Sequence, residues 1–220
     1  MENTITGINK ADQKHNYHLD SESIIDAIPN GEKPKMLMHV CCGPCFCFPL
    51  TYICPHFELT IYYNNSNIYP KEEYDRRLDE LKKVVEYAKR DYGYDIKLIV
   101  TPYEYTSYIK DLRPYSDEPE GFVRCQTCYR KRMSEAYDYA EANGFDYFCT
   151  VMTISRHKNA QILNRIGAEL EKQHKYTKYF YSDFKKDDGQ EKGRLLRIQY
   201  DLYNQDYCGC EFSIRTKKGE

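Results

Sequence analysis

Residues 36–45 read Met36-Leu37-Met38-His39-Val40-Cys41-Cys42-Gly43-Pro44-Cys45. The first five residues form a short, mostly apolar run, which predicts a strand buried inside a sheet. Three cysteines and a Gly-Pro pair follow at once, so we expect them in the loop at the carboxyl end of that strand. Open α/β sheets place their chemistry in such loops. This stretch therefore predicts both the start of the core and the position of the functional site.

Strands and helices alternate along the rest of the chain. Short apolar or aromatic runs predict further strands at 59–63, at 96–100, within 145–153 and at 179–181. Apolar side chains at helical spacing predict helices at 71–90, 126–142, 158–173 and 190–203, and a short helix at 103–112. Parallel strands need crossover connections, which these helices can supply. The pattern predicts an α/β fold: a single domain with a mostly parallel sheet flanked by helices, Rossmann-like or HUP-like, with a metal site at the carboxyl ends of the strands.

The chain divides into three parts. Residues 1–33 are mostly polar and end at a turn signal, Pro29-Asn30-Gly31, so we expect an N-terminal arm. Residues 34–213 contain the predicted strands and form the domain proper, and residues 214–220 form a basic tail. No stretch approaches the roughly 20 apolar residues of a membrane helix, and the polar, acidic start differs from a secretory signal. We therefore expect a cytoplasmic monomer that is not bound to a membrane.

Sulfur and aromatic side chains stand out in the composition. The 220 residues include 10 Cys, 23 Tyr and no Trp, and 32 Lys+Arg against 34 Asp+Glu give a net charge of −2. The net charge of a nearly neutral chain does not by itself indicate a nucleic-acid or membrane partner. Ten cysteines are too few for a disulfide scaffold, which has more than about 8–10% Cys. Because structural disulfides rarely persist in the cytosol, metal binding or redox chemistry explains these cysteines better.

Most of the cysteines fall into three close groups. These are Cys41, Cys42 and Cys45, then the C-x-x-C pair Cys125 and Cys128, and then the C-x-C pair Cys208 and Cys210. Soft thiolates at such short spacing suit zinc, copper(I) or iron–sulfur clusters. The solitary cysteines are expected to be buried side chains that only pack, namely Cys47, Cys54 and Cys149.

The adjacent pair Cys41-Cys42 fits a single zinc ion poorly. Neighbouring side chains diverge, so both would reach one tetrahedral ion only with strain, whereas they can reach different irons of a cube. A [4Fe–4S] cluster takes four cysteines, which Cys41, Cys42, Cys125 and Cys128 can supply. The C-x-C pair could then work as a dithiol and disulfide, or bind a second metal together with Cys45.

Several motifs occur in one order along the chain. They are His39 to Cys45, Tyr63 to Pro70 followed by Glu73-Tyr74 and Arg77, Arg124 to Tyr129, Gly144-Phe145-Asp146, Asp183-Phe184, and Tyr203 to Cys210. In this order and combination they resemble the cobalamin-independent epoxyqueuosine reductases, the QueH family. The resemblance runs from about residue 35 to residue 213, nearly the whole predicted domain.

The resemblance implies a reaction and its cofactors. Members of this family reduce the epoxide on the cyclopentane ring of epoxyqueuosine, in the anticodon loop of tRNA, to the alkene of queuosine. A [4Fe–4S] cluster is implied on Cys41, Cys42, Cys125 and Cys128. A redox-active disulfide is implied between Cys208 and Cys210. A second mononuclear metal, iron or zinc, is implied beside the cluster, with Cys45, Cys208 and Cys210 as its candidate ligands.

Two positions differ from the usual pattern of the family. Cys45 stands where other members can have Asp, and Lys185 stands where they often have Arg, which alone can contact phosphate in a bidentate manner. Loss of the epoxide oxygen as water requires two electrons and two protons, so the site needs a proton donor. The catalytic candidates are Asp183, His39 and Tyr207, besides the Cys208 and Cys210 pair.

A neutral chain can still bind tRNA through a local basic rim. Basic side chains flank the motifs: Arg124, Arg130, Lys131 and Arg132 at the C-x-x-C pair, Arg156, His157 and Lys158 after the fourth strand, Lys185 and Lys186 after the fifth, and Arg215, Lys217 and Lys218 at the end. Phosphate contacts of this kind give salt-dependent affinity. Asn64 and Asn67 are expected to contact the substrate nucleoside. The predicted partners are tRNA bearing epoxyqueuosine and an electron donor that the sequence does not identify.

Two other functions compete with this interpretation. A zinc-stabilised RNA-binding module without redox activity would use the same cysteines, and would be a colourless protein with one zinc ion per chain. A nucleotide-dependent tRNA-thiolating enzyme would need a Ser-Gly-Gly phosphate loop after the first strand, where Cys41-Cys42-Gly43-Pro44 stands instead. The chain also has no G-x-G-x-x-G or Walker sequence, so dinucleotide and P-loop functions lack support.

Overall fold

A parallel sheet forms the centre of the protein in the computed structural model, which describes residues 15–214. Its order is β3-β2-β1-β4-β5, and all neighbouring strands run parallel. The strands are β1 (Lys35–His39), β2 (Glu58–Tyr63), β3 (Lys97–Val100), β4 (Tyr147–Thr150) and β5 (Lys178–Tyr179). The predicted α/β fold is thereby confirmed.

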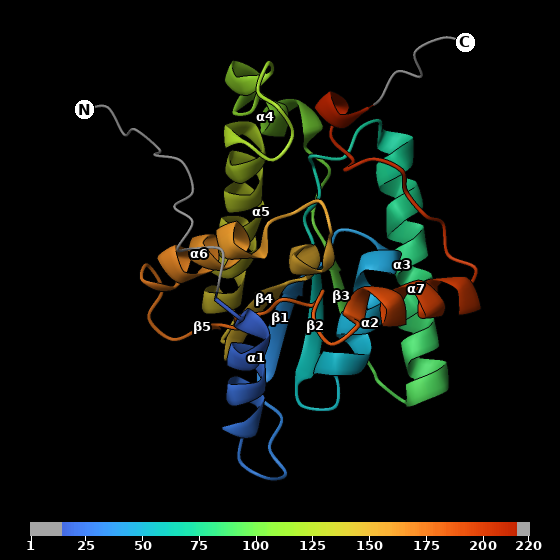
Figure 1. The fold of residues 1–220 in the computed structure, drawn as a ribbon, viewed down its shortest axis with the longest axis vertical. Coiled ribbons are helices and arrows are strands. Elements are labelled where there is room, and N and C mark those ends of the chain that lie inside the picture. The colour runs from blue at the N-terminus through green and yellow to red at the C-terminus, as the bar shows by residue number, and fades with distance from the viewer. Residues whose placement is uncertain (1–14, 215–220) are drawn as a thin grey trace.

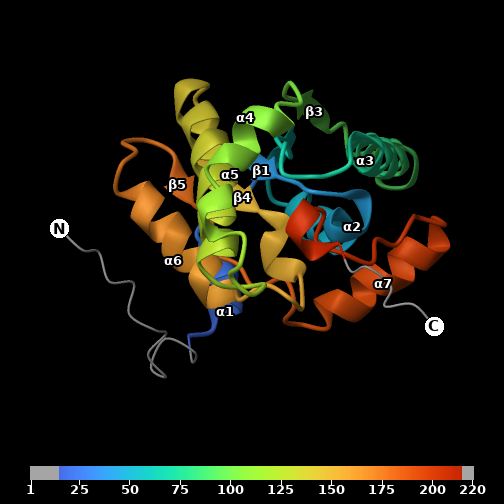
Figure 2. The same ribbon diagram turned by 90° about the horizontal axis from the view of Figure 1, so that it is seen from above.

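Helices cover both faces of the sheet (Figures 1 and 2). They are α1 (Tyr17–Asp26), α2 (Gly43–Ile53), α3 (Lys71–Tyr92), α4 (Tyr105–Lys110), α5 (Val123–Ala142), α6 (Ala160–Glu171) and α7 (Gly189–Gln199). Short 3-10 turns follow at η2 (Arg113–Tyr115), η3 (Val151–Ile154) and η4 (Glu211–Ser213). Helix α2 packs between α3 and α7 on one face, whereas α5 and α6 pack together on the other. The result is a three-layer α/β/α arrangement.

The central strand β1 contributes to both layers of the core. Met36 and Met38, together with Val40 just after the strand, are buried in the cluster formed with α2 and α3. Leu37 is buried in the other cluster, with side chains of α5 and α6. Successive side chains of a strand point to opposite faces, and here helices cover both. The sequence of a strand that is buried on both faces is a continuous apolar run rather than an alternation of apolar and polar residues. This explains why the apolar run at residues 36–40 predicts the strand.

Helix α2 differs from the sequence-based expectation. We expected residues 41–45 to form a loop, but the helix begins at Gly43 and carries Cys45 in its first turn. Pro44 suits the second position of the helix, because N–H groups of the first turn have no partner within the helix and a proline already has the right φ. A Cβ at Gly43 would lie 2.7 Å from the carbonyl oxygen of Glu80 in α3. Gly43 therefore allows α2 to approach α3 closely, a long-range reason that the local turn signal concealed.

The order of the strands locates the functional edge. With the order β3-β2-β1-β4-β5, the chain direction across the sheet reverses between β1 and β4. Open α/β sheets bind ligands in the crevice at the carboxyl ends of the strands at such a switch point. Cys41 follows β1 and the segment 151–158 follows β4 at this edge. The predicted location at the carboxyl ends of the strands agrees with the topology.

The ends of the chain are only partly described. Residues 1–14 of the predicted arm lie outside the described residues, whereas Tyr17–Asp26 forms α1. The predicted basic tail lies outside as well apart from Ile214, and with it Arg215, Lys217 and Lys218. Within residues 15–214, no helix combines the length and the apolar character that crossing a membrane requires.

Candidate functional site

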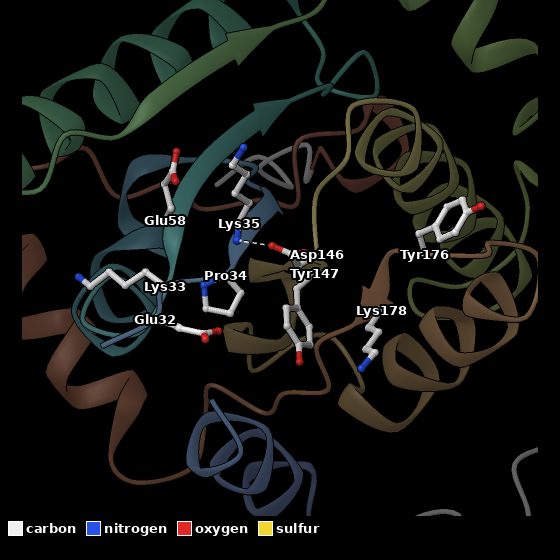
Figure 3. Close-up of a pocket in the computed structure, with 9 residues that line it drawn as sticks. All are labelled: Glu32, Lys33, Pro34, Lys35, Glu58, Asp146, Tyr147, Tyr176 and Lys178. Atoms are coloured by element: carbon white, nitrogen blue, oxygen red, sulfur yellow. Dashed lines mark hydrogen bonds between the residues drawn. The ribbon is translucent and has the colours of Figure 1, made fainter. Parts of the chain in front are cut away.

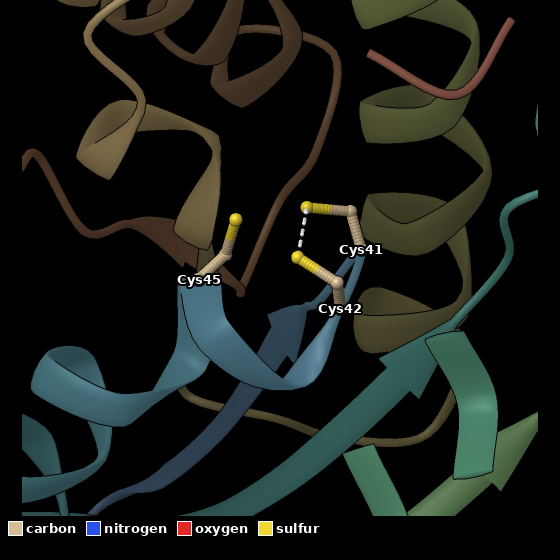
Figure 4. A group of neighbouring side chains, drawn as sticks. All are labelled: Cys41, Cys42 and Cys45. Atoms are coloured by element: carbon tan, nitrogen blue, oxygen red, sulfur yellow. Dashed lines mark hydrogen bonds between the residues drawn. The ribbon is translucent and has the colours of Figure 1, made fainter. Parts of the chain in front are cut away.

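Three cysteines converge where β1 meets α2. The Sγ atoms of Cys41, Cys42 and Cys45 all lie within 4.8 Å of one another, and those of Cys41 and Cys42 are 3.8 Å apart (Figure 4). Cys42 is buried, while Cys41 and Cys45 remain partly exposed. The extended backbone of Cys42, with φ −172° and ψ 162°, precedes the helix and turns this side chain toward its neighbours. Among the described residues, the three sulfurs form a group close enough to hold a metal ion.

Protons are shared unequally among these thiols. Hydrogen bonds from Cys42 and Cys45 lower the pKa of Cys41 well below its usual range. Burial, and then the neighbouring Cys41, raises the pKa of Cys42 to about 12. Hydrogen bonds with Cys41 and Cys42 raise the pKa of Cys45 as well. The first proton therefore leaves readily, and further negative charge needs a compensating cation, which is what a thiolate-bound metal provides.

A glutamine that is remote in sequence donates hydrogen bonds to two of these sulfurs. The Nε2 atom of Gln205 donates to Sγ of Cys42 at 3.0 Å and to Sγ of Cys45 at 3.7 Å. Hydrogen bonds from outer groups orient metal ligands and tune the metal. Gln205 was not predicted from the sequence, and no local signal distinguishes it from any other loop glutamine.

The C-x-x-C pair lies in the first two turns of α5, at the start of a helix as predicted. Cys125 and Cys128 are both buried. The backbone N–H of Gly121 donates to Sγ of Cys125 at 3.2 Å, and the hydroxyl of Tyr108 donates to Sγ of Cys128 at 3.3 Å. Burial raises the pKa of Cys125, while the Gly121 N–H counteracts this rise. Each sulfur thus faces a donor that stabilises negative charge on it.

The C-x-C pair is anchored to α3 by a buried arginine. Arg77 Nη1 donates to the carbonyl oxygen of Cys208 at 3.0 Å, and its Nη2 donates to that of Tyr207 at 3.1 Å. Its Nε donates to Glu73 at 2.6 Å, so an ion pair holds the fork in place. Gly209 has φ +113°, and a Cβ there would lie 2.8 Å from Arg77 Nη1. The segment therefore needs glycine at its centre in order to seat against Arg77.

The two cysteines of this segment differ in environment. Cys208 is partly exposed, whereas Cys210 is buried and its Sγ lies 3.5 Å from the hydroxyl of Ser213. Burial, and then a thiolate at Cys208, raises the pKa of Cys210 to about 11. Both are free thiols in the structure. The disulfide implied by the family resemblance therefore stays a prediction.

A polar cavity of about 350 Å³ connects the first and third cysteine groups. Its lining comprises Cys41, Cys45, Arg77, Glu120, Ser155, Arg156, His157, Lys158, Asn204, Gln205, Asp206, Tyr207, Cys208 and Ser213. Lys158 is half-buried in this wall. Burial works against its charge, but thiolates at Cys208, Cys41 and Cys45 together with Tyr129 raise the pKa of Lys158 above its ordinary value. Lys158 therefore stays positively charged in the cavity wall, beside the sulfurs.

A second hollow lies at the opposite end of the sheet (Figure 3). It measures about 500 Å³ and is lined by the starts of strands, including Lys35 and Tyr147. The backbone N–H of Lys35 donates to Asp146 across it at 2.8 Å. No cysteine lines it, so the chemistry indicated by the sequence belongs to the other end of the sheet.

The predicted proton donors are placed differently from one another. His39 is fully buried, with Nδ1 2.9 Å from the hydroxyl of Thr150 and Nε2 3.3 Å from Asn65 Oδ1. Burial, and then the positive charge of Arg132, lowers the pKa of His39 to about 3, so the ring is neutral and fully engaged at neutral pH. Tyr207 lines the cavity, and its hydroxyl donates to the carbonyl oxygen of Tyr69 at 2.6 Å. Of these two, Tyr207 alone can face a substrate.

Asp183 and Lys185 form an ion pair away from this cavity. Lys185 Nζ lies 2.7 Å from Asp183 Oδ1 and donates to the carbonyl oxygen of Thr153 at 2.8 Å. Neither residue is among those that line the cavity. In the structure Lys185 ties the segment after β5 to η3, and the predicted catalytic and tRNA-binding roles of Asp183 and Lys185 remain predictions.

The predicted nucleic-acid contacts divide into buried and exposed residues. Arg124 is 4% exposed, and its Nη1 donates to carbonyl oxygens of the loop before α5, those of Tyr115, Ser116 and Glu118. Arg132 is 2% exposed. The expectation that these arginines belong to an exposed basic rim is therefore wrong for both, because α5 turns them toward the interior. Arg130 is exposed and pairs with Glu169.

Asn64 and Asn67 are also buried. Asn64 Nδ2 donates to the carbonyl oxygen of Arg132 at 3.0 Å and to Glu135 at 3.1 Å, which ties the loop after β2 to α5. The Oδ1 atoms of Asn64 and Asn67 have no hydrogen-bond partner among the described residues. Buried acceptors usually find a partner, so each of these two amides has an acceptor that the described residues leave unused.

The solitary cysteines pack as predicted. Cys47, Cys54 and Cys149 are all buried, and burial raises the pKa of each to about 12. Protonated thiols in apolar surroundings are inert. They therefore provide natural controls for the cysteines of the three groups.

Known proteins resemble this chain over most of its length. The family model described as "Epoxyqueuosine reductase QueH" matches residues 36–216. A protein of Streptococcus pyogenes with that name is 38% identical over 185 residues, which cover 84% of this chain and 72% of the relative. The protein of that name from Staphylococcus aureus is 37% identical, with 82% and 76% covered. Among solved structures, a U34-tRNA thiolase, NcsA from Methanococcus maripaludis with its [4Fe–4S] cluster, is 13% identical with a TM-score of 0.48, covering 90% of this chain and 68% of its own.

Proposed function

The chain belongs to the epoxyqueuosine reductase QueH family, and we propose on this basis that it reduces the epoxide of epoxyqueuosine in a tRNA anticodon loop to the alkene of queuosine. It is an oxidoreductase. The reaction consumes two electrons and two protons and releases one water molecule. The observation that carries the proposal is the cavity at the switch point of the sheet, because sulfurs of two cysteine groups line it together.

The donor set fits an iron–sulfur cluster. Cysteine thiolates are the usual ligands of such clusters, and three of the four predicted ligands accept hydrogen bonds from protein donors, namely Cys42, Cys125 and Cys128. We propose that Cys41, Cys42, Cys125 and Cys128 would hold a [4Fe–4S] cluster. When bound, it would supply electrons one at a time. Cys45 would be left over, and in the alternative use of the C-x-C pair it would hold a second metal, iron or zinc, together with Cys208 and Cys210.

The Cys208 and Cys210 pair supplies matching chemistry. Oxidation of two thiols to a disulfide releases two electrons and two protons, which is what the epoxide needs to become an alkene and water. Arg77 fixes the backbone of this segment, so the partly exposed Cys208 faces the cavity. An external electron donor must then reduce the pair for the next turnover.

The chain's own groups can manage the protons and the substrate. Lys158 and Tyr207 line the cavity and carry protons beside Cys208. Arg156 and His157 are exposed on the same segment, next to Lys158. We propose that these two contact tRNA phosphates, with Arg130 further out, since the buried Arg124 instead shapes the loop before α5. We place the reaction in the cytoplasm, where free thiols stay reduced.

Anaerobic purification followed by iron, sulfide and zinc analysis tests this proposal. A brown protein with about four irons per chain, the content of a [4Fe–4S] cluster, would support it. Turnover is then measured with tRNA bearing epoxyqueuosine and a chemical reductant. The Cys208→Ser variant should lose turnover, whereas the matched Cys54→Ser variant, altered in a buried packing thiol, should keep it. A colourless protein with one zinc ion and no iron would instead establish the zinc-stabilised module.

A further inference from the structure

Arg132 is a buried cation without a carboxylate partner. Arg132 has one of the largest fully buried side chains among the described residues, and the residue as a whole is 2% exposed. No ion pair within residues 15–214 includes it, whereas the equally buried Arg77 is paired with Glu73. Its Nε and Nη2 atoms also lack hydrogen-bond partners among the described residues. A buried charge without compensation destabilises a folded protein strongly, so Arg132 needs an anionic partner that no carboxylate within residues 15–214 supplies.

The position of Arg132 indicates which anionic groups its charge can stabilise. Cys125, Cys128 and Arg132 are spaced by three and four residues on α5, so they share one face of the helix. Burial disfavours the charge of Arg132, but thiolates at Cys128, Cys208 and Cys41, with Tyr108, raise its pKa. These thiolates come from all three cysteine groups. Arg132 thus lies within electrostatic reach of every group.

We infer that Arg132 is the counter-charge of the cysteine site, and that its unpartnered N–H groups stabilise the anionic metal–thiolate group bound there. This inference rests on the proposed function only in that the site binds a metal–thiolate group. Arg132 then acts by stabilising the negative charge of the bound metal–thiolate group, and it does not contact the substrate. The same side chain must have opposite effects in the two states of the protein: it destabilises the metal-free fold and stabilises the loaded one.

The reduction of a bound cluster should depend on Arg132 as well. Reduction adds one negative charge to the group, and a nearby cation favours the reduced form. Without the cation, the ratio of reduced to oxidised cluster at a given applied potential should fall at least tenfold, which is about 59 mV for a one-electron couple. Cluster potentials are known to respond to net charge and to hydrogen bonds on the sulfurs.

Three variants of the full chain test the inference. Arg132→Met removes the charge with similar bulk, Arg132→Lys keeps the charge, and Arg194→Met makes the same change at an exposed arginine of α7 that pairs with Glu191. Thermal unfolding is measured on metal-free protein, metal retention is measured against a chelator, and the midpoint potential is measured by an anaerobic redox titration. Arg132→Met should unfold at the same or a higher temperature when metal-free, retain metal at least tenfold more weakly, and shift the potential downward. Arg132→Lys should recover much of the shift, and Arg194→Met should match the parent chain.

Two results would overturn the inference. One is an Arg132→Met variant that is destabilised equally with and without metal, or that does not fold, as expected of a side chain that merely packs. The other is unchanged metal retention and potential. Failure of the proposed function looks different: the parent chain would bind zinc instead of iron. Zinc retention by Arg132→Met against the parent would then still decide the role of Arg132.

Discussion

Replacing Arg77 by methionine should loosen the Cys208-Gly209-Cys210 segment and lower the stability of the whole domain. The side chain of Arg77 is 2% exposed and that of Glu73 is 10% exposed, so their ion pair is buried. Removing one partner of such a pair costs about 3–5 kcal/mol. The two hydrogen bonds to the carbonyl oxygens of Tyr207 and Cys208 are lost at the same time. Because all these interactions share one side chain, their energies do not add.

A loss of about 4 kcal/mol is therefore the expected magnitude. In a chain of this size 1 kcal/mol changes the melting temperature by about 2–4 °C, so the midpoint should fall by roughly 8–16 °C. Typical domains are stable by about 5–15 kcal/mol, so the variant should remain folded at room temperature. Local effects should exceed the global one, because the freed carbonyl groups belong to the C-x-C segment itself.

Urea unfolding and thiol alkylation measure the two effects separately. Cys210 is buried in the parent chain, so its alkylation, followed by mass spectrometry of its peptide, reports opening of the segment. A local loss of 1.4 kcal/mol corresponds to tenfold more open protein and, for fast reclosing, to tenfold faster alkylation. Arg77→Lys should keep the charge facing Glu73 but lose the fork, and should therefore expose Cys210 with a smaller loss of global stability.

Lys82→Met on the same helix is the matched control. Lys82 pairs with Asp79 at 2.8 Å, and both side chains are more than half exposed. Its removal should change stability by no more than about 0.5 kcal/mol. The reasoning is refuted if Arg77→Met stays within 1 kcal/mol of the parent chain, or if Cys210 is alkylated no faster in it than in the control.

Three further predictions concern the fold, its pH dependence and the metal. Gly43→Ala should cost about 1–3 kcal/mol in urea unfolding, because its Cβ would meet a carbonyl oxygen of α3; an unchanged midpoint would show that α2 can shift freely. The N–H groups of residues 175–177, that of residue 177 above all, lower the pKa of Glu141 from 4.5 to about 2. The stability that Glu141 contributes is thus fully present above pH 4.5 and is lost as the pH falls toward 2, so the melting temperatures of the parent chain and Glu141→Gln should converge over that range, and a constant gap would contradict it. Cys125→Ala should lose bound iron after anaerobic reconstitution while Cys149→Ala keeps it, and equal iron contents in the two would remove Cys125 from the ligand set.

Much of the fold was predictable because its signals are local. The strand at 36–40 and the helix at 71–90 show their burial in the order of apolar residues, and the structure places β1 and α3 there. The start of α2 was not predictable in the same way. Gly43 and Pro44 resemble a turn, and only the close approach of α3 explains why a helix begins with them. The predicted helix at 103–112 likewise ends early, as α4 and a separate 3-10 turn at Pro114.

The sequence predicted which cysteines belong to the site, but it did not predict the burial and the partners of the charged residues around them. The motifs grouped Cys41, Cys42 and Cys45, and the structure brings their sulfurs together. Arg124 and Arg132, by contrast, were expected on an exposed rim and are buried. Asp183, predicted as a catalytic residue, pairs with Lys185 and does not line the cavity, so its catalytic role stays a prediction. A charged residue in a sequence looks the same whether its helix face meets solvent or the core.

The sequence by itself determined the order of strands and helices, the family and the inventory of thiols, because periodicity, spacing and motif order are properties of neighbours along the chain. The tertiary structure decided which thiols share protons, which cations balance them and which side chains reach the cavity. Those properties depend on residues that are remote in sequence: Gln205 binds the sulfur of Cys42 across 163 positions, and Arg77 holds the carbonyl group of Cys208 across 131. Electrostatic interactions and burial depend on distance in space, and folding alone sets those distances.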